Sequence, residues 1–329
     1  MLLSDDIEFE APKPPVKDIL GGAGSYSALG ARIFSPPPLS KSVGWIVDCG
    51  SDFPAELRRT IDAWNTSCLY RETPERLTTR GWNGYGANEY RAFKYLTSKI
   101  RLDENALTPQ LLLSKCFHLI CSPERCVSMI DGILGRRRGY DNEVKHPIFV
   151  WEPVPDLCTP EELENCMKAL QRVDYVSPNH EELAGFYGAQ GNTDDGVDRP
   201  LIEKCSRDWL DSRARDSKLK AIIVRAGKEG CYVANDTRNS WIPAYHQDGK
   251  RVIDPTGGGN AFLGGLAIEL ARGSSVTDAA IYGSVAASFA IEQVGVPVLS
   301  SGSSGKEEWN GESAANRVEE LRRRWQQLS

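Results

Sequence analysis

The fold of this chain is decided by one stretch, Asp254-Pro255-Thr256-Gly257-Gly258-Gly259-Asn260-Ala261-Phe262. A strand-like approach at residues 251–253 leads into the three glycines, and apolar residues then recur at helical spacing, at Leu263, Leu266, Ala267 and Leu270. Glycines in this position let the backbone turn tightly and bring its N–H groups close to a ligand, and the start of a helix adds unpaired N–H donors. The stretch therefore predicts an anion-binding pocket, most often for phosphate, with a plain helix-entry turn as the alternative.

The composition is that of an ordinary globular protein. The 329 residues are 40% hydrophobic and 26% charged, and the length suits one large α/β domain or two small ones. A net charge of −6 without a basic stripe argues against nucleic acid as the main partner. No apolar segment approaches the length of a membrane span, and the acidic first residues are unlike a signal or transit peptide. These features predict a cytoplasmic protein with neither a membrane nor a nucleic-acid partner.

The cysteines and histidines show no metal-binding spacing. The nine cysteines are odd in number, scattered and mostly inside apolar runs, and no CxxC pair is formed by Cys116, Cys121 and Cys126. This pattern indicates reduced thiols in an intracellular protein rather than disulfides or zinc ligands. The four histidines are interpreted as structural, namely His118, His146, His180 and His246.

The middle of the chain alternates between short apolar strands and helices. Strands are predicted at 43–47, 116–120, 147–151, 173–176 and 221–224, and helices at 55–64, 124–134, 160–170, 180–187 and 200–212. This alternation is typical of βαβ units around a parallel sheet that is covered on both faces, so the prediction is an α/β fold. In such a sheet the ligand binds in loops that lead from strands to helices, and the glycine stretch is such a loop.

The remaining segments predict a lid, a linker and a final helix. Residues 5–20 and 66–90 are predicted to supply the strands of a small β lid, since the second segment is rich in Thr, Tyr, Trp and Gly with little helical period. Residues 300–312 are predicted to be a flexible linker from their Ser and Gly content. Residues 313–329 are predicted to form a charged amphipathic helix, and residues 1–299 a single domain.

Four motifs in one order resemble those of the PfkB (ribokinase-like) carbohydrate kinases. The family signature Asp-Thr-x-Gly-Ala-Gly-Asp-x-Phe stands here as residues 254–262. Gly21-Gly22 resembles the di-glycine of the sugar site, and Asn179-His180-Glu181-Glu182 resembles the Asn-x-x-Glu motif. Residues 225–230 resemble the Thr-x-Gly-x-x-Gly loop beside the nucleotide. The resemblance covers nearly the whole chain, and stretches such as 78–83 look closest to a fungal branch, the "maintenance of killer" kinase-like proteins.

This resemblance implies a fold and an activity. The fold would be a three-layer α/β/α sandwich with a mostly parallel central sheet and a small β lid. The activity would be ATP-dependent transfer of a phosphoryl group to a sugar or sugar-like hydroxyl, with Mg²⁺ spanning the phosphates. The partners would be a nucleotide and a sugar-like small molecule, and pairing of lids would form a homodimer.

The resemblance also implies roles for individual residues. The anion hole would be made by the N–H groups of Gly257, Gly258 and Gly259, and a water on Glu182 would help to place Mg²⁺. Contacts to the nucleotide would come from Asn179, Arg225, Gly227, Gly230 and Thr256. Contacts to the substrate would come from Asp5, Gly21, Gly22, Tyr26 and Asp254.

Departures from the family pattern concern the chemistry itself. Asn260 stands where the family has the Asp that accepts the proton of the attacking hydroxyl. An amide has no useful basicity near neutral pH, so general-base assistance worth roughly 10²–10⁴-fold is expected to be absent. Tyr26 stands where the family has a sugar-binding Asn, which predicts an altered, smaller or absent sugar pocket. Pro255 and Arg225 each replace a Thr of the family.

The N-terminus departs as well. The family's first strand is missing before Ile7, so Asp5 or Asp6 would stand near the usual substrate-binding Asp without the strand that positions it. A shortened gene model or a truncated chain would explain this difference.

Several alternatives stay open at the level of the sequence. A slow kinase is favoured by the glycines and Glu182, whereas a pseudokinase with a regulatory or scaffolding role is favoured by Asn260 and Tyr26. A nicotinamide dehydrogenase would need Gly22-Ala23-Gly24 as its fingerprint, and Ser27 stands where the third glycine belongs.

Local alternatives also remain for the residues of the nucleotide motifs. Asn179 would serve as a plain helix N-cap and Glu182 as a surface carboxylate, and Gly227 and Gly230 would form a hairpin turn.

Overall fold

A computed structural model describes residues 3–8, 14–85, 91–140, 145–303 and 305–328. The chain divides into two compact units that interleave along the sequence. The first unit comprises Met1–Leu102, Lys250–Gly264 and Ala286–Ala314, and the second comprises Asp103–Gly249, Gly265–Val285 and Ala315–Ser329. The single domain predicted over residues 1–299 stays a prediction, and each unit is described here by itself.

The second unit is built on a six-stranded sheet in the order β14-β13-β12-β9-β8-β7. Strands β7, β8, β9 and β12 are parallel, and β13 and β14 continue the sheet in antiparallel pairing. The strands span Cys116–Ile120 (β7), Ile148–Glu152 (β8), Tyr175–Val176 (β9), Ala221–Arg225 (β12), Cys231–Asn235 (β13) and Ser240–Ile242 (β14). The parallel strands carry nearly continuous apolar runs, as expected for strands buried on both faces, and the predicted α/β class is confirmed.

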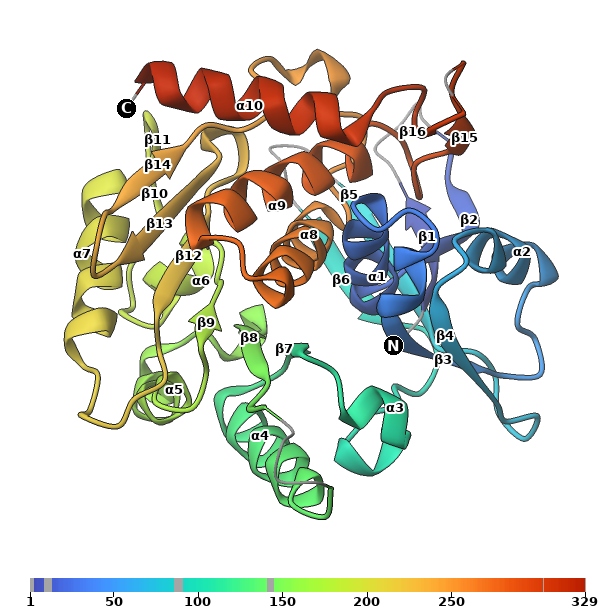
Figure 1. Cartoon of the computed structure of the whole chain (residues 1–329), viewed down its shortest axis with the longest axis horizontal. Coiled ribbons are helices and arrows are strands. Elements are labelled where there is room, and N and C mark those ends of the chain that lie inside the picture. Colours follow the sequence, from blue (N-terminus) through green and yellow to red (C-terminus); the bar gives the residue numbers. More distant parts are fainter. Residues whose placement is uncertain (1–2, 9–13, 86–90, 141–144, 304, 329) are drawn as a thin grey trace. The chain divides into compact units, whose positions relative to one another are not determined.

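Helices of the second unit follow the strands in the predicted alternation (Figure 1). They are α3 (Pro109–Leu112), α4 (Pro123–Arg137), α5 (Leu163–Leu170), α6 (His180–Gly185) and α7 (Arg199–Asp211). Side-chain caps fix four of their starts; Ser122, for example, accepts a hydrogen bond from the Arg125 N–H, and Asp198 accepts one from the Leu201 N–H. α7 packs on β12 and β13, where Trp209 is fully buried and meets the ring of Phe186 edge-on. A small hairpin, β10 (Asn192–Thr193) and β11 (Gly196–Val197), precedes α7.

The first unit contains a four-stranded sheet in the order β2-β1-β5-β6. Its strands span Leu3–Glu8 (β1), Val16–Gly21 (β2), Arg80–Tyr85 (β5) and Arg91–Tyr95 (β6). A separate parallel pair joins β3 (Gly44–Cys49) to β4 (Ser67–Glu72). Helix α1 (Ala23–Ile33) follows β2, and α2 (Ala55–Ala63) connects β3 to β4.

The predicted lid segment 66–90 is therefore divided between two sheets. β4 pairs with β3 because α2 carries the chain back in a βαβ crossover, which brings the two strands parallel. Among the described residues of this segment, only those of β5 join the four-stranded sheet, and β6 extends that sheet beyond residue 90. Residues 86–90 lie outside the described part of the chain.

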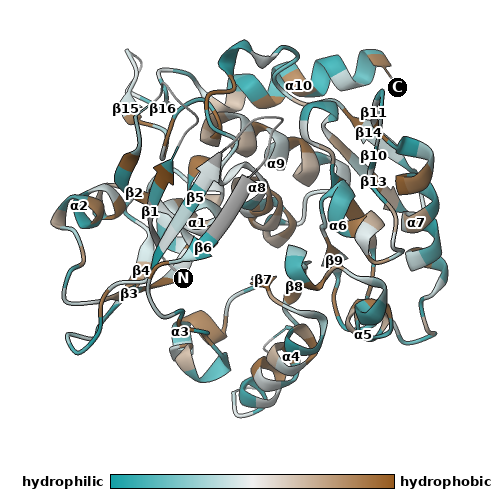
Figure 2. Ribbon diagram, turned by 180° about the vertical axis from the view of Figure 1, so that it is seen from behind, coloured by the Kyte–Doolittle hydropathy of each residue, from teal (hydrophilic) through white to brown (hydrophobic). Residues whose placement is uncertain are grey.

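Helices α8 (Gly258–Arg272) and α9 (Val276–Ala290) contribute residues to both units, and α10 (Ala314–Leu328) occupies the predicted final helix. Hydrophilic and hydrophobic residues alternate along α10 in Figure 2, and its apolar side buries Val318 and Leu321.

The predicted flexible linker, residues 300–312, instead contains most of a hairpin formed by β15 (Leu299–Ser301) and β16 (Glu307–Trp309). Three side chains anchor it within the first unit. Glu307 pairs with the buried Arg32 at 2.6 Å, Trp309 is 1% exposed, and the Asn310 Oδ1 accepts a hydrogen bond from the Val298 N–H at 2.9 Å. The prediction of a linker relied on the Ser and Gly content of the segment and gave no weight to these three residues.

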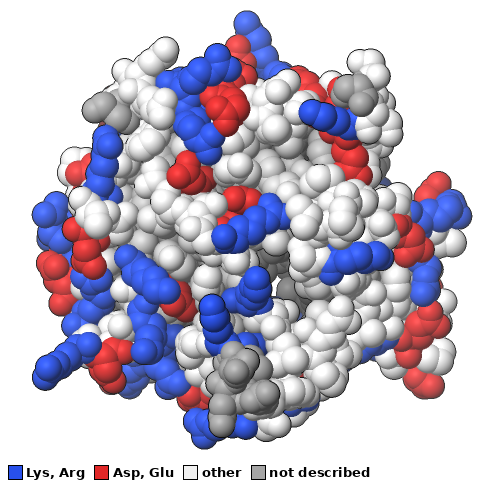
Figure 3. All heavy atoms as spheres, viewed as in Figure 1, with Lys and Arg blue, Asp and Glu red and all other residues white. Residues whose placement is uncertain are grey.

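Charge is mixed over the face shown in Figure 3, where basic and acidic side chains are interspersed. Within the described ranges, none of the helices combines the length and the apolar character needed to cross a membrane.

Candidate functional site

The glycine loop of the first unit begins with a buried carboxylate. Asp254 is 1% exposed, and its Oδ1 accepts hydrogen bonds from the Thr256 N–H at 2.9 Å and from the Thr256 Oγ1–H at 2.6 Å. The N–H groups of Ile253 and Asp254 donate to the carbonyl oxygen of Ile291. These contacts fix the backbone that leads into α8, so Asp254 orients the loop.

Two of the glycines are required by close packing. Gly257 has a φ of +78°, and a Cβ at this position would lie 2.3 Å from ring atoms of Tyr26. A Cβ at Gly258 would lie 2.7 Å from the Cγ2 of Ile291. Only glycine adopts this φ without strain. A plain helix-entry turn would therefore require Gly257 even without a bound phosphate, so this glycine does not distinguish between the two alternatives.

The N–H groups of the loop differ in their availability to an anion. The Gly258 N–H donates to the Pro255 carbonyl oxygen at 3.2 Å, and the Ala261 N–H donates to the Gly257 carbonyl oxygen at 2.8 Å. The N–H group of Gly259 belongs to the first turn of α8, where the helix itself supplies no hydrogen-bond acceptor. This N–H group, together with the positive end of the helix dipole, is a suitable donor for a bound anion.

Tyr26 packs beneath this loop. The residue is 2% exposed, its ring lies against Gly257, and its hydroxyl donates to the carbonyl oxygen of Gly295 at 3.2 Å. The phenol therefore fills space inside the first unit rather than lining an open pocket.

The di-glycine has a clear backbone role. Gly22, with a φ of +83°, precedes α1 and accepts hydrogen bonds from the N–H groups of Ser25 and Tyr26. Gly21 ends β2 opposite Leu3. Asp5 lies in β1 opposite Ile19, and its side chain lies outside the described residues.

A cavity of about 600 Å³ also lies in the first unit. Its polar lining includes Asp18, Asp52 and Arg80, and Arg80 forms ion pairs with both carboxylates. None of the residues predicted to form the site contributes to this lining.

In the second unit, Asn179 and Glu182 form a capping box at the start of α6. The Asn179 Oδ1 accepts from the Glu182 N–H at 2.7 Å, and the Glu182 Oε2 accepts from the Asn179 N–H at 2.7 Å. The Glu182 Oε1 accepts a further hydrogen bond from the Asn179 Nδ2 at 2.9 Å. The N-cap alternative is therefore present in full, and the surface alternative for Glu182 is wrong because the side chain is only 6% exposed.

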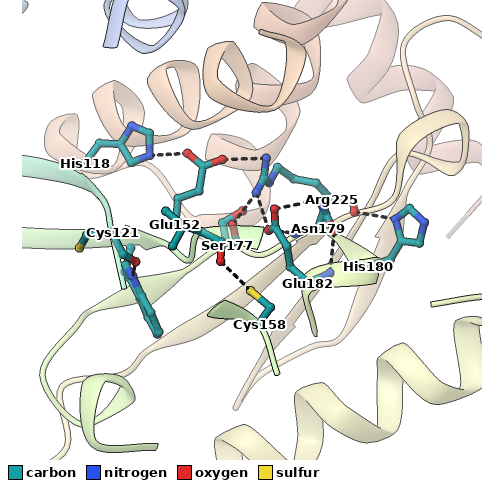
Figure 4. A network of polar contacts seen from close by, with 11 residues as sticks. His118, Cys121, Glu152, Cys158, Ser177, Asn179, His180, Glu182 and Arg225 are labelled. Carbon is teal, nitrogen blue, oxygen red and sulfur yellow. Dashed lines mark hydrogen bonds and ion pairs between the residues drawn. The ribbon is translucent and has the colours of Figure 1, made fainter. Parts of the chain in front are cut away.

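Arg225 lies between two buried carboxylates (Figure 4). Its Nη1 lies 3.0 Å from the Glu152 Oε1, and its Nη2 lies 3.2 Å from the Glu182 Oε2. The Nη2 also donates to the Ser177 carbonyl oxygen at 3.0 Å, and His118 Nε2 lies 3.0 Å from the Glu152 Oε2. We call Glu152, Glu182 and Arg225 the Arg225 cluster.

Burial shifts the acidity of this cluster. The pKa of Glu182 is raised to about 7, chiefly because burial penalises the charged carboxylate. The Arg225 guanidinium opposes the rise in pKa, Glu152 adds to it, and the hydrogen bond from the Asn179 N–H opposes it.

Glu152 was missed by the sequence predictions, and His118 was interpreted as structural. Glu152 ends β8 and Arg225 ends β12, so both lie at the carboxyl ends of buried strands in one sheet. A charged residue that closes an apolar strand was the available signal, since that edge of a parallel sheet is where ligands bind.

Gly227 and Gly230 form the tight turn between β12 and β13. Their φ values are +54° and +91°, and a Cβ at Gly230 would lie 2.0 Å from the carbonyl oxygen of Ile242. These φ values account for both glycines without any bound ligand. A contact of this turn with a nucleotide therefore stays a prediction.

Comparison with known proteins places this geometry in a family. The family model "pfkB family carbohydrate kinase" matches residues 152–300. Protein MAK32 of Saccharomyces cerevisiae is 37% identical over 314 residues, which cover 90% of this chain and 84% of that protein. Inositol 3-kinase of Arabidopsis thaliana is 34% identical over 79 residues, or 24% of this chain and 22% of that protein.

A similar solved structure is that of a protein described as ribokinase II from E. coli, in complex with ATP and Mg²⁺. The TM-score is 0.65, and the match covers 98% of this chain and 97% of that one. Because the sequence identity is only 15%, this similarity is evidence for the fold alone. With the glycine loop, the Asn-x-x-Glu capping box and the mostly parallel sheet in place, the chain belongs to the pfkB carbohydrate kinase family and has its ribokinase-like fold.

Proposed function

We propose that this chain is a slow ATP-dependent phosphotransferase that acts on a sugar-like hydroxyl. The observation that carries the proposal is the glycine loop, in which the buried Asp254 fixes a turn that leads into the N-terminus of α8 and the N–H group of Gly259. Phosphoryl transfer depends mainly on positioning and on stabilising developing negative charge, and such a loop supplies both. Kinases of the family use ATP with Mg²⁺, and the ATP-bound relative supports the same donor here.

The transfer is slow because Asn260 cannot take a proton from the attacking hydroxyl. An amide in this position leaves the anion-binding groups intact and removes only the base. The expected deficit relative to a chain with a carboxylate is therefore on the order of 10²-fold or more.

The acceptor is expected to be compact. Tyr26 fills the space beside Gly257, where the family's sugar-binding Asn would stand. The partial similarity to an inositol 3-kinase adds small cyclic polyols to the sugars and nucleosides that should be tried.

The test measures ADP release with ATP, Mg²⁺ and a panel of sugars, nucleosides and inositols. Slow release by the unaltered chain and an increase on the order of 10²-fold in Asn260→Asp are expected. Asn239→Asp, at an exposed position outside both motifs, is the charge-matched control and should change nothing.

A second candidate, a nucleotide-binding pseudokinase with a regulatory or scaffolding role, is favoured by the burial of Tyr26 under the loop. It predicts no turnover in either protein, while ATP still raises the melting temperature by mass action. If ATP and ADP fail to raise the melting temperature of either protein, both candidates are rejected.

A further inference from the structure

The Arg225 cluster is a closed set of charges in the second unit. Arg225 gives one terminal nitrogen to each carboxylate, at 3.0 Å for Glu152 and 3.2 Å for Glu182. The three side chains are 13%, 7% and 6% exposed for Arg225, Glu152 and Glu182, respectively. Two carboxylates so deeply buried need a compensating positive charge, and the guanidinium provides it with a planar fork that serves both.

Every carboxylate oxygen in the cluster already has a partner. The Glu182 Oε1 accepts from the Asn179 side chain, and its Oε2 accepts from the Asn179 backbone and from Arg225. The Glu152 Oε1 pairs with Arg225, and its Oε2 lies 3.0 Å from His118 Nε2. A bound cation, or a water on such a cation, would have to share these oxygens with the partners that they already have.

These residues do not fit Mg²⁺. The ion requires near-octahedral oxygen ligands at about 2.0–2.1 Å, and an ion whose waters bind these carboxylates would lie close to the guanidinium, whose positive charge repels it. In the described part of the chain, no group of three or more His, Cys, Asp and Glu side chains is arranged to hold a metal ion. The water-mediated role that the family resemblance gave to Glu182 is therefore in conflict with the contacts that Glu182 makes.

We propose that Arg225 is a built-in cation that does, for Glu152 and Glu182, what a bound divalent cation would otherwise do. The family's neutral Thr at this position would leave both carboxylates without a positive partner, whereas arginine carries its charge on the chain itself. The Arg225 cluster consequently offers no site for a divalent cation, and removing the guanidinium creates one. The proposal does not depend on whether the chain turns over ATP.

The test titrates free Mn²⁺, followed by electron paramagnetic resonance, into the unaltered chain and into Arg225→Thr without nucleotide. The unaltered chain should show only weak, unsaturable binding, and Arg225→Thr should bind Mn²⁺ roughly 10–100-fold more tightly at one site. Added Mg²⁺ should compete at that site. Arg199→Thr is the matched control, because it breaks the 2.7 Å pair of Arg199 with Glu229 outside the cluster and should create no site.

Two results would overturn the proposal. One is a folded Arg225→Thr chain that binds Mn²⁺ no better than the Arg199→Thr control. The second result does not require a substitution at Arg225, so it can be obtained even if the Arg225→Thr chain does not fold. If the unaltered chain has a saturable Mn²⁺ site that Glu182→Gln abolishes, then Glu182 already serves a cation and Arg225 does not replace it.

Discussion

The glycine loop of the first unit and the Arg225 cluster of the second unit are held by different forces. The loop is a backbone structure, in which one buried carboxylate and two glycines, Gly257 and Gly258, set the path of the chain. The cluster is a side-chain structure, assembled from the ends of β8 and β12 and from the start of α6. The loop departs from the family pattern at Pro255 and Asn260, whereas the cluster carries the charge of Arg225 where the family has a neutral Thr. In a site made by the backbone, replacing one side chain leaves the path of the chain unchanged. In a site made by side chains, replacing one residue changes the electrostatics of the whole site.

The largest effect on stability is expected from Arg225→Met. The substitution leaves Glu152 and Glu182 buried without their shared cation, which should cost about 3–5 kcal/mol of unfolding free energy. Denaturant unfolding of the purified chain measures it. Arg322→Met is the control, since Arg322 pairs with the half-exposed Asp278 and should cost less than about 1 kcal/mol. Equal losses in the two variants would show that the cluster contributes no more than a surface ion pair.

Gly257→Ala should have the next largest effect and tests the loop. The alanine would adopt a φ of +78° and place its Cβ 2.3 Å from the Tyr26 ring, so strain and overpacking should together cost about 2–3 kcal/mol. Thermal and denaturant unfolding measure the loss.

The control for this variant is Gly227→Ala. Gly227 also has a positive φ, of +54°, but a Cβ there meets nothing within 4 Å, so only the backbone strain of about 1 kcal/mol applies. If Gly257→Ala costs no more than Gly227→Ala, Tyr26 does not pack against the loop as tightly as the structure indicates.

The contrast between the two regions also shows what the sequence can predict. The alternation of short apolar strands with helices was sufficient for the α/β class, and the run of glycines was sufficient for a turn into α8. Both predictions rest on local patterns, whose residues lie within a few positions of each other in the sequence. The turn into α8 could therefore be predicted, but the strand expected at residues 251–253 was wrong, because Gly249–Arg251 form a short 3₁₀ helix and, in the described chain, no strand lies between them and α8. The anion-binding role of the loop stays a prediction.

Pairings between distant segments were not predictable in the same way. Nothing local to residues 67–72 indicates that β4 joins β3 rather than the four-stranded sheet. The anchors Glu307 and Trp309 sit in a segment whose composition resembles a linker. The partners of Arg225 are likewise invisible until the sheet brings β8 and β12 into one layer.

The smallest effect on stability is expected at Asn179, which contributes both to a helix cap and to the side-chain contacts of Glu182. Asn179 caps α6 through its Oδ1 and also donates its Nδ2 to Glu182. Asn179→Ala removes both contacts and should cost about 1 kcal/mol, with an upper limit near 2 kcal/mol. Asn179→Ser keeps an oxygen that can cap the helix and loses only the donor to Glu182, so most of the stability should return. Denaturant unfolding of both variants separates the contributions. If the serine variant is as unstable as the alanine variant, the contact with Glu182 outweighs the cap, and Asn179 belongs to the Arg225 cluster rather than to the helix.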